Sequence, residues 1–410
     1  MKLEAGKVAN AQLFFIVLGM LLGSSMILNP AQSIGRDGWL SVLAGMVEGL
    51  LFLWVFVTLT ARFQGQTLVQ INDLIFGPLL GKLVSLAYLW FFLHLGGIVL
   101  RDFGDFYTAI VYPETPIIVI MLTLALLCAS AVRNGLEVLG RCSMFLVPIA
   151  VFFIVFDSLL LIRETELSNL LPVLDVQWKE FFAVSHGVAT FPFGETVIFL
   201  MVLAFSNNQR KAGTAMFWAM FAGGLLLSWL SARNTGVLGA TASIQTYPSF
   251  PVIRFINIGE IITRLEIIIG AILLSLGFIK IAIYYYGTVL GLAQLVRLRS
   301  YLPLVLPVGA LMVFLSIFLF ESNVENINFS FSIYPYYSIP FQIGLPLLSL
   351  LVAVIRGVPG KNKQGEQGGQ RKNEQDEEAG NGSIQGERGN KRNNRQGEGV
   401  NSKAENGGRG

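Results

Sequence analysis

The stretch HGVATFPFGETVIFL, residues 186–200, decides how this chain folds. Its flanks are apolar enough for a membrane helix, yet Pro192, Gly194 and Glu195 lie at its centre. Proline removes a backbone donor and clashes with the preceding turn, and glycine tolerates unusual dihedral angles. We therefore expect a helix that unwinds near its middle. Inside a bilayer such a break is stable only where protein or a polar cavity surrounds it.

The composition around this stretch is that of a membrane protein. Apolar residues make up 53% of the 410 residues and charged residues 13%, and the mean hydropathy is +0.62. A soluble domain could not shield so many apolar runs. Since about 20 apolar residues span a bilayer as a helix, we predict an all-α polytopic protein of ten transmembrane helices. The predicted spans are 11–33, 39–61, 82–112, 116–133, 142–163, 181–205, 213–231, 265–292, 302–320 and 335–355.

The short loops orient these spans. With the N-terminus in the cytoplasm, the inner loops collect lysine and arginine and the outer loops collect glutamate and aspartate, as the positive-inside rule requires. Both termini are therefore predicted to be cytoplasmic. Residues 1–356 form the predicted membrane domain. Residues 357–410 are Gly, Asn, Gln and mixed charge, and we predict a disordered hydrophilic cytoplasmic tail because they offer little to bury.

The first predicted span contains a second interruption. Leu22-Gly23-Ser24-Ser25-Met26 is followed within a turn by Asn29-Pro30. Spans one and six would open two five-span halves, and breaks in both are typical of inverted-repeat transporters with a midplane substrate site. Half-helix N-termini there attract a carboxylate, whereas unwound carbonyls face a cation. The plain alternative is a pair of kinks in packed helices.

These motifs together resemble the endospore germination permeases, the B subunits of nutrient germinant receptors in the amino acid–polyamine–organocation superfamily. The resemblance covers residues from about 10 to 356, and the order and spacing of its motifs, FPFGE at 191–195 among them, make the set specific. The motifs in their order along the chain are Leu22-Gly23, Asn29-Pro30, Asp37-Gly38-Trp39, Arg101, Glu114-Thr115-Pro116, Leu171-Pro172-Val173 and Phe191-Pro192-Phe193-Gly194-Glu195.

The resemblance implies a leucine-transporter-like 5+5 inverted repeat with helices 1 and 6 discontinuous. It implies a receptor subunit that binds a small nutrient, commonly an amino acid, and triggers spore germination with partner A and C subunits. The protein would lie in the inner membrane of the bacterial spore, with both termini on the core side. The same fold also serves a proton- or Na⁺-coupled amino acid transporter, and a ligand-gated ion channel component is a third possibility.

Two ionisable residues inside predicted spans are the main candidates for polar anchors. Glu195 directly follows the break, where it can receive an ammonium group, hold a proton or cap the restarted half-helix. Lys280 lies too deep in span eight to reach the interface, and Tyr284 lies one turn further on the same face. A fixed ammonium can replace a bound Na⁺. Alternatively, Lys280 only neutralises a carboxylate.

We predict a ligand site between spans one, three, six and eight. Each of its residues also has a plain packing alternative. The candidate ligand-binding residues are Gly23, Ser24, Ser25, Phe91, Leu95, Pro192, Phe193, Gly194, Glu195, Lys280 and Tyr284.

Other polar residues lie outside this candidate site. Arg101 and Asp105 stand at i and i+4, so we predict a pair near the outer mouth. Glu48 and Asp157 have no partner that the sequence identifies. The loop around residues 246–251 is either a cap over the outer vestibule or a connector.

Enzyme signatures are missing from the sequence. It contains no HExxH, GxSxG or dinucleotide fingerprint. Its two histidines, His94 and His186, are far apart, which makes a metal site improbable. We predict no catalytic residues, no metal and no cofactor.

Overall fold

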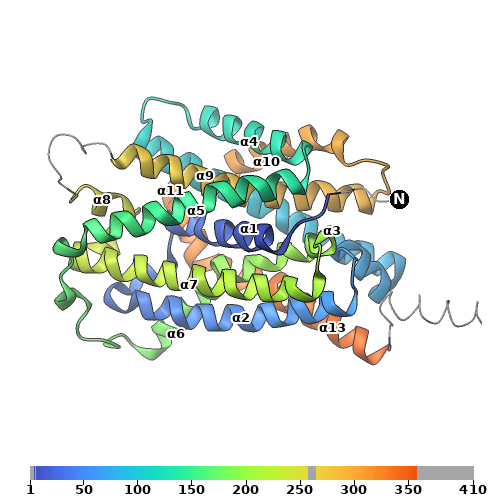
Figure 1. The fold of residues 1–410 in the computed structure, drawn as a ribbon, viewed down its shortest axis with the longest axis horizontal. Helices are drawn as coiled ribbons and strands as arrows, with labels where there is room; N and C mark the ends of the chain where they lie inside the picture. Colours follow the sequence, from blue (N-terminus) through green and yellow to red (C-terminus); the bar gives the residue numbers. More distant parts are fainter. Residues whose placement is uncertain (1–3, 5, 257–264, 358–410) are drawn as a thin grey trace, which may run out of the picture. The chain divides into compact units, whose positions relative to one another are not determined.

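The computed structural model describes residues 4, 6–256 and 265–357. These residues form helices joined by short segments, and the single β-bridge among them joins Val8 to Ser206. In this part of the chain seven helices are long and apolar enough to cross a membrane, and three shorter apolar helices accompany them (Figure 1). The predicted all-α membrane class is confirmed.

The first span is interrupted where the sequence predicts it. The helix α1, Asn10–Leu22, ends as Gly23 leaves helical geometry with φ −34° and ψ −101°. A short 3₁₀ turn, η1, covers Ser24–Met26. Residues 30–33, which we assigned to this span, belong instead to a second 3₁₀ segment, η2 (Pro30–Asp37). The reason is local, because Asn29 is extended and its side chain caps the new segment at Ala31.

The sixth span is interrupted at the FPFG motif. It begins as α6, Trp178–Val188, and changes to a π-helical turn, η6, over Ala189–Phe193. Phe191 has the non-helical angles φ −132° and ψ 105°. The chain then restarts as a 3₁₀ helix, η7, over Gly194–Met201. The predicted break is therefore confirmed.

The remaining elements follow in order along the chain. They are α2 (Gly38–Arg62), α3 (Leu68–Phe106), η3 (Tyr107–Val111), α4 (Ile117–Arg133), α5 (Leu136–Leu160), η4 (Ile162–Glu164), η5 (Leu167–Leu170), η8 (Leu203–Phe205), α7 (Gln209–Leu238), η9 (Gly239–Ile244), α8 (Ser249–Ile253), α9 (Leu265–Leu295), α10 (Leu302–Phe318), α11 (Asn323–Asn328), η11 (Phe329–Ile333), α12 (Tyr334–Ile339), η12 (Pro340–Gly344) and α13 (Leu345–Ile355).

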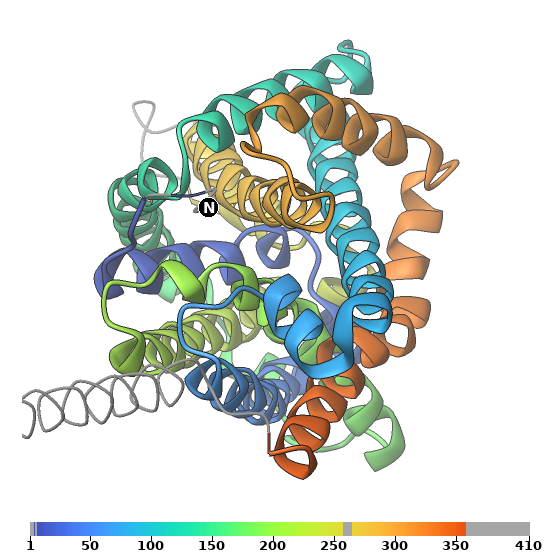
Figure 2. The ribbon, with the colours of Figure 1, turned by 90° about the vertical axis from the view of Figure 1, so that its right-hand side faces the viewer.

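Helix α1 lies in the interior of the bundle. It packs against α5, α7 and α9, while α3 runs along α9 and α2 along α7 (Figure 2). Its residues Ile16, Val17 and Met20 are fully buried. Many large apolar side chains point outward from the surrounding helices, for example Trp54 and Phe145. A surface of this kind suits lipid rather than water. The arrangement places the Gly23 break deep inside the protein.

Four predicted spans were too short at their polar ends, and among them the fifth, predicted from residue 142, begins at Leu136. The third span, predicted from residue 82, begins as a helix at Leu68 and is interrupted at Gly77, whose φ is 82°. The seventh extends from Gln209 to Leu238, and the tenth region begins at Asn323. An apolar window excludes polar residues such as Asn326, which is nevertheless buried inside the protein. The predicted tail lies almost wholly in residues 358–410, outside the described residues.

Candidate functional site

The ammonium group of Lys280 lies between the two helix breaks. Its Nζ is 2.6 Å from Oε2 of Glu195 and donates to Oγ of Ser24 at 2.7 Å. It also stands 4.5 Å from the centre of the Phe191 ring, a favourable cation–π distance. The Lys280 and Glu195 side chains are 0% and 2% exposed. Three predicted site residues, from spans one, six and eight, therefore converge.

A polar chain from the tenth region supports Glu195. The Tyr334 hydroxyl donates to Oε1 of Glu195 at 3.3 Å. Gln342 donates through Nε2 to that hydroxyl at 3.0 Å and to the carbonyl of Thr190 at 3.0 Å. Gln342 therefore satisfies the Thr190 carbonyl in the π-helical turn and stabilises the shape of the break. This role of Gln342 was not among the predictions from the sequence. The only indication of this role in the sequence was the position of the polar Gln342 within an otherwise apolar run after Pro340.

Two glycines allow the close packing at the breaks. A Cβ on Gly23 would lie 3.1 Å from both Cβ and Cδ of Lys280. A Cβ on Gly194 would lie 2.1 Å from Oε1 of Gln342. Such distances require neighbouring atoms to move. Glycine suits both positions because another side chain fills the space beside the backbone.

Tyr284 is also close to the Lys280 pair. It is fully buried and interacts electrostatically with Glu195. Its hydroxyl has no hydrogen bond of normal geometry within the described chain. A hydrogen-bonding ligand would satisfy that hydroxyl.

The predicted apolar walls turn toward neighbouring helices. Phe91 stacks on Phe341 with ring centres 4.4 Å apart, and Leu95 is 1% exposed. Phe193 packs closely on α2. A Cβ added to Gly49 of that helix would lie 2.3 Å from the Cβ of Phe193. Pro192 is buried within the π-helical turn. Contact between these residues and a nutrient stays a prediction.

Ser25 lines a small cavity on the α7 side of the break. Its side chain is 4% exposed, and its hydroxyl has no hydrogen-bond partner within the described residues. The cavity has a volume of about 20 Å³, and Asn234 and Ser249 are among its lining residues. A volume of this size holds roughly one water molecule. Neither Lys280 nor Glu195 lines this cavity.

The segment between α7 and α9 covers the Ser25 cavity. Nε2 of Gln32 donates to the Ala242 carbonyl at 2.6 Å, and Asn234 donates to Oγ of Ser249 at 3.0 Å. Further along, Asn323 donates to the Tyr247 hydroxyl at 3.0 Å. These contacts favour the cap over the connector, and we call residues 242–253 the outer segment.

Two further ion pairs hold the helices around the site. Arg101 and Asp105 pair at 2.9 Å, as predicted, and Nη1 of Arg101 also donates to the Phe320 carbonyl at 2.9 Å. Asp157, for which the sequence offered no partner, pairs with Arg233 at 3.0 Å. Arg233 was not predicted as the partner because the predicted span seven ended at residue 231, before it.

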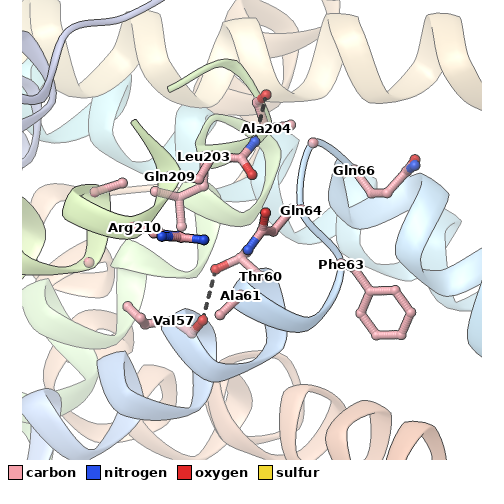
Figure 3. Close-up of a pocket in the computed structure, with 13 residues that line it drawn as sticks. Val57, Thr60, Ala61, Phe63, Gln64, Gln66, Leu203, Ala204, Gln209 and Arg210 are labelled. Carbon is pink, nitrogen blue, oxygen red and sulfur yellow. Dashed lines mark hydrogen bonds between the residues drawn. The ribbon is translucent and has the colours of Figure 1, made fainter. Parts of the chain in front are cut away.

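A different pocket opens near the ends of α2 and η8 and the start of α7 (Figure 3). It has a volume of about 90 Å³. The Thr60 hydroxyl donates to the Val57 carbonyl at 3.1 Å, and Gln209 donates to the Ala204 carbonyl at 3.4 Å. None of the predicted ligand residues lines this pocket. Among the residues that the structure describes, no group of His, Cys, Asp and Glu could hold a metal ion.

Sequence comparison identifies the family of a protein with this geometry. The family model described as spore germination protein, a permease family, matches residues 7–324. The chain belongs to this family. It is an integral membrane protein whose family and relatives are named for spore germination and whose structural neighbours are named for transport.

Individual relatives of this permease carry germination names as well. The chain is 29% identical over 373 residues to spore germination protein KB of Bacillus subtilis (strain 168), covering 89% of this chain and 99% of that protein. Spore germination protein YndE of the same strain is 25% identical and covers 71% of this chain and 82% of its own length. Spore germination protein XB of Bacillus anthracis is 22% identical over 62% of this chain and 73% of its own length.

Solved structures with a similar fold are transporters. Mhp1, a nucleobase-cation-symport-1 family transporter in a closed conformation, has a TM-score of 0.57 at 14% identity, covering 79% of this chain and 74% of Mhp1. A Na⁺-coupled sialic acid symporter has a TM-score of 0.58 at 10% identity, covering 86% and 89%. MhsT in complex with L-phenylalanine has a TM-score of 0.56 at 12% identity, also covering 86% and 89%. These identities establish the fold alone.

Proposed function

We propose that this permease is the B subunit of a nutrient germinant receptor in the inner membrane of the bacterial spore. It binds a small nutrient, an amino acid in our proposal, between the broken first and sixth helices. It then triggers germination through partner A and C subunits. Ten spans in a 5+5 inverted repeat, with both termini on the core side, complete the proposal.

The observation that carries this proposal is the convergence of Ser24, Glu195 and Lys280 at two helix breaks. A free amino acid is a zwitterion, with one carboxylate and one ammonium group. Its carboxylate matches Lys280 and its ammonium matches Glu195. Insertion of the zwitterion into the pair therefore leaves no buried charge without a partner, which would be costly. The Ser25 hydroxyl, which has no hydrogen-bond partner within the described residues, and the Tyr284 hydroxyl beside Glu195 offer two further contacts.

Binding of the nutrient requires the site to open. The Ser25 cavity of about 20 Å³ admits roughly one water molecule, not an amino acid. We propose that the outer segment moves away and that Lys280 and Glu195 separate around the nutrient. A nutrient that binds the open form more tightly shifts the population toward it. That shift is the signal that the partner subunits would receive.

A coupled amino acid transporter is the second candidate, because cation symporters are among the structures with this fold. In such folds the carbonyls at a broken helix coordinate the coupling cation. Here the ammonium of Lys280 lies 2.7 Å from Ser24 at that level. A tethered positive charge makes a free cation unnecessary, which favours a sensor. A ligand-gated ion channel component is the third possibility.

Liposomes containing the purified permease test these candidates. We expect saturable binding of a labelled amino acid from a panel and no concentrative uptake under a proton or Na⁺ gradient. Concentrative, gradient-driven uptake would establish the transporter instead. Failure of every amino acid to bind, both to the permease alone and to the three-subunit assembly, would refute the proposed ligand class. Nutrient-dependent ion flux through that assembly would support the channel.

A further inference from the structure

One ion pair between two membrane-spanning helices lies at the periphery of the bundle rather than in its core. Nδ1 of His186 in α6 is 2.7 Å from Oε1 of Glu48 in α2, and the two side chains are 27% and 33% exposed. The Lys280–Glu195 pair, by contrast, is almost completely buried. The exposed pair therefore faces whatever surrounds the bundle.

Glu48 lies at the depth of the hydrocarbon core. Helix α2 has 25 residues, from Gly38 to Arg62, and a helix rises 1.5 Å per residue. Glu48 is therefore about 15 Å from the start of a helix that crosses a core roughly 30 Å thick. Water is not available at that depth on the lipid side.

The pair sits on an apolar face built from α2 and α6. Both helices lie along one edge of the bundle, with α13 beside α2 (Figures 1 and 2). The face also carries large exposed apolar side chains, namely Val47, Leu51, Trp54, Trp178 and Phe182. We call it the α2–α6 face. The Glu48–His186 pair lies among these apolar side chains, and the charged residues Lys179 and Glu180 are exposed at the start of α6.

The pair does not satisfy Glu48 completely. Only Oε1 of Glu48 has a partner within the described residues, and that partner is His186. Its Oε2 is left as an acceptor at membrane depth. Ionisable groups inside a membrane normally face a bundle interior or a water-filled cavity. A carboxylate that is 33% exposed at this depth, with one oxygen unpartnered among the described residues, is suited to accept from a donor on another chain.

We propose that the α2–α6 face docks a transmembrane helix of a partner membrane protein. That helix carries a hydroxyl, amide or basic side chain at mid-membrane depth, and this side chain donates to Oε2 of Glu48. A second copy of the chain is a poorer match, because a two-fold contact centred here would bring two Glu48 carboxylates together. The inference rests on the proposed receptor assembly and names the surface through which the permease joins it.

The test places a nitroxide label at position 51 of a cysteine-free variant, through Leu51→Cys. Oxygen, which concentrates in lipid, and a water-soluble nickel chelate then report what surrounds the label. In the permease alone, reconstituted in lipid, we expect high accessibility to oxygen and low accessibility to nickel. In the co-expressed receptor assembly we expect oxygen accessibility to fall several-fold. A label at position 126, through Leu126→Cys on exposed α4, is the matched control and should not change.

Three results would overturn the inference. The label at position 51 could keep its high oxygen accessibility in the assembly. It could be accessible to the nickel chelate in the permease alone, or it could show dipolar coupling to the label of a second copy. The first result would mean that lipid covers the face in the assembly. The second would mean that the face lines a water-filled crevice, and the third that a second copy of the chain docks there.

The role of the carboxylate has its own measurement. Glu48→Leu should abolish the protection of the label at position 51 in the assembly, whereas Glu48→Gln, which keeps an acceptor oxygen, should retain most of it. Protection unaffected by Glu48→Leu would refute the donor contact. Amino acid binding by the permease alone is measured in parallel, so that failure of the proposed nutrient site is seen separately from failure of the docking face.

Discussion

The Lys280 ammonium lies 2.6 Å from the Glu195 carboxylate, at the level where two helices lose their regular winding. Either charge alone at this depth would be strongly unfavourable. Together they hold spans one, six and eight in a closed arrangement, because Lys280 also donates to Ser24. The pair is thus both a structural tie and the element that a zwitterionic nutrient would have to separate.

Substitutions of Lys280 and Glu195 should have non-additive effects on the free energy of unfolding. We predict that Lys280→Met costs about 3–5 kcal/mol, because it leaves Glu195 buried without a cation. The double variant Lys280→Met with Glu195→Gln should recover much of that loss, because no charge remains. Thermal unfolding of the purified proteins in one detergent measures both effects.

An exposed pair provides the control for this coupling. Arg141 and Glu137 are 71% and 44% exposed, so Arg141→Met should change stability by about 0–1 kcal/mol. Additive losses in the Lys280 and Glu195 variants would contradict a buried pair.

Gly194 and Gln342 should show a steric coupling. Gly194→Ala places a methyl group 2.1 Å from the Gln342 amide oxygen, so we predict weaker nutrient binding and a lower Tm. Gln342→Ala in the same protein removes the obstacle and should restore the Tm in part. Gly270→Ala is the control, because nothing lies within 4 Å of its added Cβ. Equal Tm values for Gly194→Ala and Gly270→Ala would show that the packing at the break is loose.

Arg101 should be irreplaceable by lysine. Its guanidinium bonds Asp105 through Nε and, through Nη1, the carbonyls of Ser316, Ile317 and Phe320 at the end of α10. Lysine keeps the charge but cannot reproduce this fork. We therefore predict that Arg101→Lys lowers the Tm clearly, although less than Arg101→Met does. A Tm for Arg101→Lys equal to that of the native protein would show that charge alone suffices.

The outer segment should control access to Ser25. In a variant that lacks Cys142, a cysteine introduced by Ser25→Cys should react slowly with a membrane-impermeant thiol reagent, because Ser25 is buried. Ser249→Ala removes the bond from Asn234, so we predict several-fold faster labelling. A saturating nutrient should change the rate as well. Identical rates under all three conditions would exclude the outer segment as the gate.

The local features of the fold were predictable from the sequence. Proline and glycine act on the backbone within a turn of their own position, so Gly23 and Pro192 marked the two breaks correctly. The i, i+4 spacing of Arg101 and Asp105 likewise led to the observed pair. The sequence left two roles open for Lys280, either to replace a bound Na⁺ or to neutralise a carboxylate, and it did not establish Glu195 as that carboxylate.

Contacts between distant helices were not predictable in the same way. Apolar periodicity tells how deep a residue lies along its own helix but not which helix faces it. The partners Arg233 of Asp157 and His186 of Glu48 therefore escaped notice. Gln342 was missed for the same reason, because its role depends on the tenth region lying beside the sixth span.

Equilibrium binding of a panel of labelled amino acids to the permease in lipid nanodiscs tests the central claim most directly. The native protein and the Gly270→Ala control should bind one or more of them saturably. Gly23→Trp should bind none while still inserting into the membrane, because even a Cβ at Gly23 would lie 3.1 Å from the Lys280 side chain. Binding by Gly23→Trp with the affinity of the native protein would place the nutrient elsewhere and contradict the account.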